Sequence, residues 1–517
     1  MKFNFNAKQK DIKMKIRYNI FAVLALIVMF TSCSKDFLEV DSIGKMSEEL
    51  FYETDEDATM AIMATYDILQ WMNARDWNSA YLVKTFPSDE SNVGGGDAGD
   101  QPPYQELGKY TYGATNAPIT AVWQSCYFGI YRANKVINKV QPETALRKQI
   151  IAEAQFLRAY YYFEIVSMFG MGPLILQEPA PSEYGQPFVQ KDAIYAQIKI
   201  DLEAAMPLLP KKSQYAAEDK FRASKGAAQA LLGKAMLYNE KWAESAAAFE
   251  LIIASNEYQL QEDFTTLFLK ESEYGVESIF EASWVTTEGY DWGTFQWGGA
   301  RPMENNITWQ LTGPRGDYFV AGETGLIGGW GFNYPKTNAY QVFVDAGDEI
   351  RKASSILSLE DLRAQGGDWT NEDSWGWDGH IRVKYGTRMD ETSGDNGAVP
   401  ELNYGTNLRL LRYADVLLMA AEANYRAGNN GVAANYLNQV RARADLGVAT
   451  GDIFEAIVKE RQMELCFEGV RFLDLVRWGR AADVLGPLGF VAGKHEVFPI
   501  PQDETRNNTN AEQNTGY

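Results

Sequence analysis

Apolar residues recur at helical spacing in two separate parts of this chain, and this periodicity constrains the fold more than any other feature. Spacings of three and four residues place such side chains on one face of a helix. The pattern predicts an early helix at 48–72, helices at 119–140, 144–168, 192–206, 224–238 and 242–255, and later ones at 413–427, 432–444, 453–467 and 470–478. We therefore predict a mainly α fold.

Two pairs of these helices resemble tetratricopeptide units. Small residues such as Ala227, Ala230 and Ala235 would allow close approach of the next helix, which begins at Trp242. The helices at 413–427 and 432–444 form a second pair of this kind. Because no strict 34-residue period exists, we interpret the pattern as degenerate tetratricopeptide-like helical repeats. An ordinary α-helical bundle is the alternative.

The middle of the chain differs in composition, because it is rich in Gly, Asn, Asp and aromatic residues. It contains few helical windows, and short strands are predicted at 278–284 and 380–385. Long loops inside a compact domain are usually functional. We therefore expect one domain built from a helical-repeat part at 33–255, a loop-rich, mixed insert at 256–408, and a C-terminal helical-repeat part with a tail at 409–517.

The N-terminus has the pattern of a secretory signal peptide. Basic residues (Lys13, Lys15 and Arg17) precede an apolar run at 20–30, which ends in Thr-Ser-Cys at 31–33. Small residues directly before a cysteine resemble a bacterial lipobox. We predict cleavage of residues 1–32 and lipidation of Cys33, which would anchor the protein to a membrane outside the cytoplasm. A cysteine near an ordinary cleavage site is the alternative.

Charge and composition disfavour several function classes. The chain has 48 basic and 69 acidic residues, a net charge of −21, and no long basic run. Such a protein repels polyphosphate, so we expect no nucleic-acid partner. Two histidines (His380 and His495) and three cysteines offer little material for metal or nucleophilic chemistry, and we expect no cofactor. Cys126 and Cys466 lie in apolar helical patterns and are expected to be buried free thiols.

One charged motif near the C-terminus indicates structure rather than catalysis. Arg461, Glu464, Glu468 and Arg471 lie at helical spacings or just across the Gly469 break. Buried charges must be paired to be tolerated. We therefore predict that these residues form an ion-pair lattice that locks two helices together.

Several long motifs resemble the SusD/RagB family of outer-membrane nutrient-binding lipoproteins. They cover nearly the whole mature chain in the expected order, at residues 33–39, 152–163, 169–175, 410–423 (LLRYADVLLMAAEA), 457–478 (IVKERQMELCFEGVRFLDLVRW), 498–502 and 513–517. The resemblance implies a SusD-like fold and a non-catalytic, lipid-anchored protein on the surface of the outer membrane. It also implies that the protein captures oligosaccharide or polysaccharide and delivers it to a SusC-like TonB-dependent transporter, which the helical-repeat face would contact.

The aromatic insert is the best candidate for the ligand surface. Most of the 13 tryptophans lie between residues 284 and 377, interleaved with Gly and Asn. Exposed rings offer flat apolar faces to sugars, as they do to bases in single-strand binders. In the family the site is built by loops of the insert and of the stretch after the first helix, here 76–115. The candidate ligand-binding residues are Tyr290, Trp292, Trp297, Trp309, Trp330, Asp89 and Asn92.

Three other readings stay open from the sequence. The tryptophans could fill a loop-rich core. A RagB-like member would bind peptides for import through backbone hydrogen bonds. A surface glycoside hydrolase needs only two carboxylates, and the many acidic residues supply countless pairs.

Overall fold

The computed structural model describes residues 51–74, 77–295 and 304–517. The predicted signal peptide and Cys33 lie outside the described residues. From Glu53 onward the chain forms one compact unit. Among the described residues, no helix is both long enough and apolar enough to cross a membrane.

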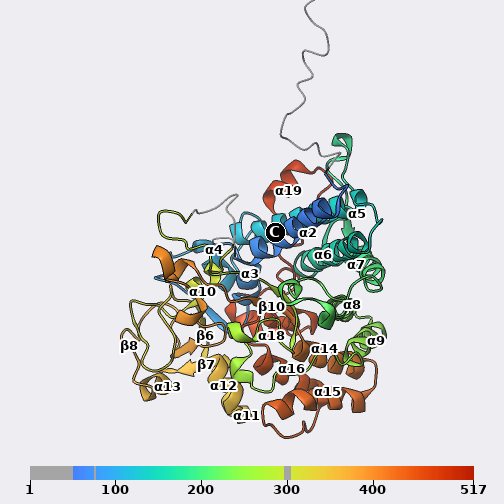
Figure 1. Ribbon diagram of the computed structural model, residues 1–517. Helices are drawn as coiled ribbons and strands as arrows, with labels where there is room; N and C mark the ends of the chain where they lie inside the picture. Colours follow the sequence, from blue (N-terminus) through green and yellow to red (C-terminus); the bar gives the residue numbers. More distant parts are fainter. Residues whose placement is uncertain (1–50, 75–76, 296–303) are drawn as a thin grey trace, which may run out of the picture. The chain divides into compact units, whose positions relative to one another are not determined.

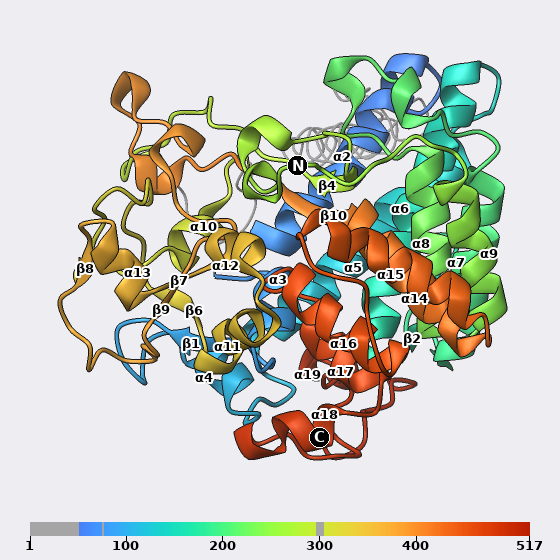
Figure 2. The same cartoon turned by 90° about the horizontal axis from the view of Figure 1, so that it is seen from below.

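Antiparallel helices packed in sequence form one side of this unit (Figures 1 and 2). Each helix from α5 to α9 packs on the next, and α9 then packs on α14, which is followed by α15 and α16. The array is therefore continuous in space although the insert separates α9 from α14 in sequence. Its helices are α2 (Asp55–Ala74), α5 (Ala117–Lys139), α6 (Ala145–Phe169), α7 (Lys191–Ala205), α8 (Lys225–Tyr238), α9 (Trp242–Ile253), α14 (Tyr413–Arg426), α15 (Asn430–Arg443) and α16 (Ile453–Glu464).

Local sequence signals set the ends of these helices. The Thr144 side chain caps the start of α6 by accepting from the Arg147 N–H at 3.1 Å, and Gly170 ends the helix with φ +74°. Small residues act as predicted between α8 and α9. A Cβ on Gly233 would lie 2.4 Å from the Phe249 ring, so only glycine allows this approach. The predicted mainly α fold is confirmed, and each of these helices starts and ends close to its predicted position, except that α2 begins later than residue 48.

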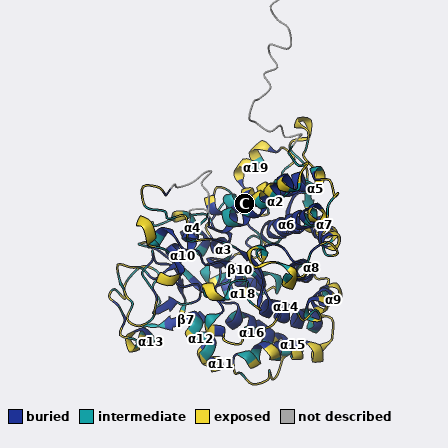
Figure 3. Cartoon of the chain, in the orientation of Figure 1, coloured by how far each residue is buried: buried dark blue, intermediate teal, exposed yellow. Residues whose placement is uncertain are grey.

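Short helices accompany the array at the two ends of the chain. They are α3 (Ala80–Thr85), α4 (Pro102–Gly108), α17 (Arg471–Arg477), α18 (Ala481–Leu485) and α19 (Gln502–Asn507). Figure 3 shows α14 and α16 as largely buried, with exposed residues gathered on outer turns such as those of α19. Cys126 and Cys466 are buried free thiols, as predicted.

The insert lies on the opposite side from α6–α9 in both views (Figures 1 and 2). Its described part contains four short α-helices that the sequence pattern did not predict, because six to ten residues are too few to establish a helical period. They are α10 (Ile307–Thr312), α11 (Thr337–Ala346), α12 (Glu349–Ser355) and α13 (Leu359–Ala364).

The described residues form five two-stranded antiparallel sheets. The two strands predicted from sequence are present, as β4 and β9. The pairs are β1 (Ser91–Gly94) with β6 (Phe332–Pro335), β2 (Met171–Pro173) with β3 (Phe188–Gln190), β4 (Ser278–Ala282) with β10 (Leu408–Arg412), β5 (Phe319–Val320) with β8 (Asp368–Trp369), and β7 (Ile356–Ser358) with β9 (His380–Arg382).

Strand β1 lies inside the glycine-rich polar stretch at 88–97, which the sequence alone does not mark as a strand. Its partner β6 lies about 240 residues away, with Ser91 opposite Pro335 and Gly94 opposite Phe332. The close approach requires glycine, because Gly94 has φ +74° and a Cβ there would lie 2.2 Å from the Gly331 carbonyl oxygen. The β1–β6 pair therefore joins the segment after α2 to the insert.

A buried ion-pair network joins the insert to the C-terminal helices. Arg412, at the end of β10, contacts Glu277, Glu464 and Glu468 at 2.6–2.7 Å. Glu464 of α16 also pairs with Arg351 of α12 at 2.8 Å and with Arg443 of α15. Burial alone would raise the pKa of Glu464, but Arg443, Arg412 and Arg351 hold it well below its usual value.

The predicted ion-pair lattice is therefore present, but it spans more elements than two helices. Arg461 pairs with Asp474 and Asp415 at 2.7 Å, and Arg471 pairs with Asp89 at 2.8 Å. The side chains of the four motif residues are buried. They form ion pairs with residues of other elements and not with one another. This arrangement indicates a structural role, because each carboxylate is already bound to a guanidinium or ammonium group.

We predict that Arg412→Ala strongly destabilises the protein, by about 3–5 kcal/mol, because it leaves buried carboxylates without their counter-charge. The matched control is Arg363→Ala, which removes an exposed pair with Asp368 (2.8 Å) and should cost no more than about 1 kcal/mol. Urea denaturation followed by tryptophan fluorescence measures both changes. Equal shifts of the two midpoints would contradict a stabilising network around Arg412.

Candidate functional site

Three tryptophans form a row, one from the segment after α2 and two from the insert. The Trp330 ring centroid lies 5.5 Å from that of Trp77 and 6.4 Å from that of Trp292, with interplanar angles of 31° and 20°. Trp292 is 53% exposed, whereas Trp77 and Trp330 are half-buried. The three rings therefore pack on one another and still expose aromatic surface to solvent.

Each ring of this row is positioned by a different element. Trp77 lies between α2 and α3, and it also packs edge-on against Phe332 of β6 at 6.1 Å. The Trp330 N–H donates to the Gln310 carbonyl of α10 at 2.9 Å. Trp292 lies within a tight turn in which Asp291 Oδ1 accepts from the backbone N–H groups of Gly293 and Thr294 at 2.7–2.8 Å. These hydrogen bonds also lower the pKa of Asp291.

An open cleft of about 770 Å³ lies alongside Trp77 and Trp330. Two backbone segments that line the cleft approach each other closely, because a Cβ on Gly329 would lie 2.6 Å from the Gln310 carbonyl oxygen. The other lining residues of the cleft are Asp100, Gln310, Arg315, Gly316, Asp317, Gly328, Phe332 and Glu401. Aromatic rings next to convergent polar groups in an open cleft suit a large hydroxylated ligand.

The structure places the predicted aromatic residues in two different settings. Trp292 and Trp330 belong to the row, and Trp297 lies outside the described residues. Tyr290 is half-buried and packs against the Phe295–Ile307–Leu402 cluster, and its backbone N–H donates to Asn403 Oδ1 at 2.8 Å. Trp309 is 2% exposed, stacks on Tyr385 at 4.5 Å and donates its Nε1–H to the Thr406 carbonyl at 2.8 Å.

The two predicted polar residues also differ in their placement. Asp89 is buried, and both of its carboxylate oxygens accept from Arg471, at 2.8 and 2.9 Å. Asn92 is half-buried on β1, opposite Tyr334 of β6. Asp89 and Trp309 therefore occupy structural positions, and neither lines the cleft.

Sequence reasoning missed Trp77 and most of the polar lining of the cleft. Trp77 lies in the 76–115 segment that was expected to contribute to the site, so its aromatic character was an available signal. Gln310 and Glu401 carry no such signal, because an isolated Gln or Glu in a loop-rich region is common. Their role in the cleft depends on contacts that only the folded chain makes.

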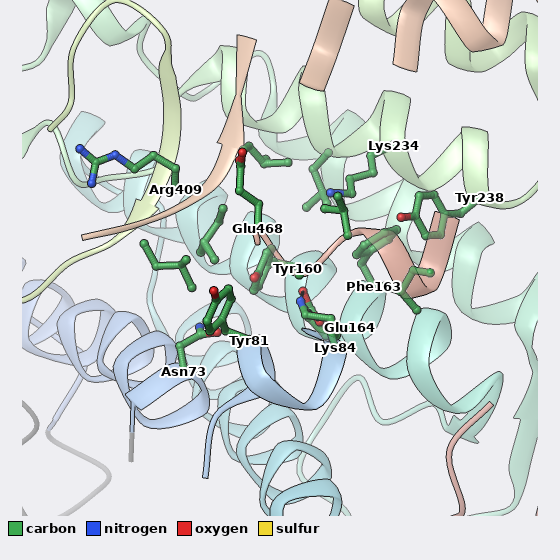
Figure 4. Close-up of a pocket in the computed structure, with 17 residues that line it drawn as sticks. Asn73, Tyr81, Lys84, Tyr160, Phe163, Glu164, Lys234, Tyr238, Arg409 and Glu468 are labelled. Carbon is green, nitrogen blue, oxygen red and sulfur yellow. Dashed lines mark hydrogen bonds and ion pairs between the residues drawn. The ribbon is translucent and has the colours of Figure 1, made fainter. Parts of the chain in front are cut away.

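A second cavity lies deep in the helical core (Figure 4). It is lined by α3, α6, α8 and β10, with Lys84 and Glu164 paired at 3.0 Å on one side and Lys234 and Tyr238 on another. Its volume of about 40 Å³ has room for a few waters but not for a sugar ring. It is therefore part of the scaffold. Among the residues that the structure describes, no group of three or more His, Cys, Asp or Glu could hold a metal ion.

Two family profiles match separate parts of the chain. The profile described as "SusD family" matches residues 280–489, and the profile described as "Starch-binding associating with outer membrane" matches residues 36–237. SusD-like protein P25 of Formosa agariphila is 26% identical, and the match covers 96% of this chain and 97% of that protein.

Solved structures show the same fold. A "Laminarin binding SusD-like protein" has a TM-score of 0.81 and 32% identity, with 90% of this chain and 100% of that chain covered. Surface glycan-binding protein A from Bacteroides thetaiotaomicron, solved in complex with laminarihexaose, has a TM-score of 0.76 and 25% identity, with 89% and 99% covered. The predicted SusD-like fold is confirmed, and these names describe binding proteins rather than enzymes. The chain therefore belongs to the SusD/RagB family and is a non-catalytic member of it.

Proposed function

We propose that this protein is a cell-surface lipoprotein of the outer membrane that captures a laminarin-type glycan on the row formed by Trp77, Trp330 and Trp292. The row beside the open cleft is the observation that carries this proposal. Rings fixed in advance by β6, α10 and the Asp291 turn lose little freedom on binding, which favours affinity. The names of the laminarin-binding structural relatives support the choice of glycan.

The captured glycan is then passed to a SusC-like TonB-dependent transporter. Stacking and hydroxyl contacts are individually weak, so the ligand can leave the cleft once the transporter takes it. Helices α6–α9 of the array lie on the opposite side from the insert, which carries Trp292 and Trp330 (Figure 2). The array is the surface that we assign to the transporter.

We predict that Trp292→Ala weakens binding of laminarihexaose about tenfold or more, since stacking on an aromatic ring contributes about 1–3 kcal/mol in comparable systems. Trp292 is 53% exposed, so its removal should leave the fold unchanged. Isothermal titration calorimetry measures the effect. Tyr184→Ala is the matched control, because this ring is 70% exposed outside the row and should not alter affinity. Unchanged binding by Trp292→Ala would favour ligand capture through backbone hydrogen bonds, as expected for a peptide binder.

The proposed lipid anchor on Cys33 is tested by substituting this residue. Cys33→Ala should abolish incorporation of radiolabelled palmitate and move the protein from the outer-membrane fraction to the soluble fraction. Cys126→Ala is the control, because Cys126 is a buried thiol that should carry no lipid. Retention of the label in the Cys33 variant would disprove the anchor.

The proposed transporter partnership is tested on outer membranes of the producing bacterium. An affinity-tagged chain should co-purify a TonB-dependent transporter, identified by mass spectrometry. Trp292→Ala should co-purify the same transporter, because the row of rings and the assigned docking surface lie on different elements. Loss of the transporter in this variant, or recovery of the chain alone, would contradict the arrangement.

A further inference from the structure

The charged groups that line the cleft are mostly acidic. Three carboxylates (Asp100, Asp317 and Glu401) accompany a single cation, Arg315. Arg315 Nε donates to Asp317 Oδ2 at 2.9 Å, and its Nη1 donates to the Trp330 carbonyl at 3.3 Å. Neither Asp100 nor Glu401 forms an ion pair with any residue that the structure describes. The lining therefore keeps a negative charge after its one ion pair is counted.

Gln310 adds a neutral acceptor inside the same cleft. Its side chain is 1% exposed, and its Oε1 has no hydrogen-bond partner among the described residues. The backbone carbonyl of Gln310 accepts a hydrogen bond from the backbone N–H of Trp330 at 2.9 Å, so these two cleft-lining residues are joined through their backbones. A buried acceptor without a hydrogen-bond partner costs free energy. A ligand hydroxyl that donates a hydrogen bond to Gln310 Oε1 would remove that cost.

We infer that the cleft selects neutral glycans, with Gln310 accepting a hydrogen bond from a sugar hydroxyl and with Asp100 and Glu401 excluding chains that carry carboxylate or sulfate groups. This inference rests on the proposed glycan-binding function. Carboxylates accept hydrogen bonds well from neutral hydroxyls. An anionic substituent brings a like charge into a partly desolvated cleft, where repulsion is stronger than in water.

The first test compares two ligands of equal length. Laminarihexaose and the same hexasaccharide oxidised at C6 to carboxylates are titrated into the full chain by calorimetry. We expect the neutral hexasaccharide to bind about tenfold tighter or more in dilute buffer. The ratio should shrink when salt rises from about 50 mM to about 500 mM, because salt screens charges in an open cleft.

Charge-neutralising variants locate the source of the selectivity. The double variant Asp100→Asn, Glu401→Gln should bind the oxidised hexasaccharide more tightly, and it should keep hydrogen-bond acceptors for the neutral one. Glu218→Gln, Glu262→Gln is the matched control, since it makes the same change in net charge at two exposed positions outside the cleft. If the control relieves the discrimination equally, the selectivity comes from overall charge and the assignment to the cleft is wrong.

Gln310→Leu separates a ligand contact from a structural role. Removing an unpaired buried acceptor should leave the unfolding midpoint unchanged or raise it, because leucine needs no hydrogen-bond partner. Affinity for laminarihexaose should nevertheless fall about tenfold. A lower midpoint with unchanged affinity would show that Gln310 only supports the fold.

The outcomes distinguish this inference from the proposed function. Equal binding of the two hexasaccharides, or tighter binding of the oxidised one, overturns the inference and leaves glycan capture intact. Failure to bind either hexasaccharide or any neutral polysaccharide in a broad panel overturns the proposed function, and the inference with it.

Discussion

Pairing of buried arginines with carboxylates is the constraint on which the rest of this structure depends. Arg412 alone joins three glutamates, and Glu464 accepts from arginines of α12, β10 and α15. Moving one partner of a buried ion pair away is costly, because it leaves an uncompensated charge in the protein interior. The network therefore fixes the insert against the helical array. Two rings of the candidate site, Trp292 and Trp330, are carried by this insert.

Strand pairing extends this order from the scaffold to the ligand surface. The β1–β6 ladder holds the segment after α2 against the insert, next to Trp77 and Trp330. Glycines at the crossing points let two backbones meet without side chains between them. Loops can then be rigid at their bases and variable at their tips. This division explains how one helical fold can present different binding surfaces.

Some candidate residues turned out to be structural for a physical reason. Trp309 and Trp292 are the same residue type in the same glycine-rich region, yet one is 2% and the other 53% exposed. Asp89 looked like a polar ligand contact, but it neutralises Arg471 from the far end of the chain. Composition records how many rings and charges a segment carries. Whether a ring faces a ligand or fills the core depends on which distant segment covers it.

The sequence by itself determined the helical scaffold, because helical periodicity, capping residues and small-residue faces are local properties of neighbouring residues. It also placed the ion-pair motif and the aromatic insert, and its motifs indicated the family. Tertiary structure alone decided the partners of the charged residues, the presence of β1, and the presence of Trp77 and Gln310 in the lining of the cleft. These features arise from contacts between residues up to about 380 positions apart. Such contacts leave no periodic trace in a single sequence.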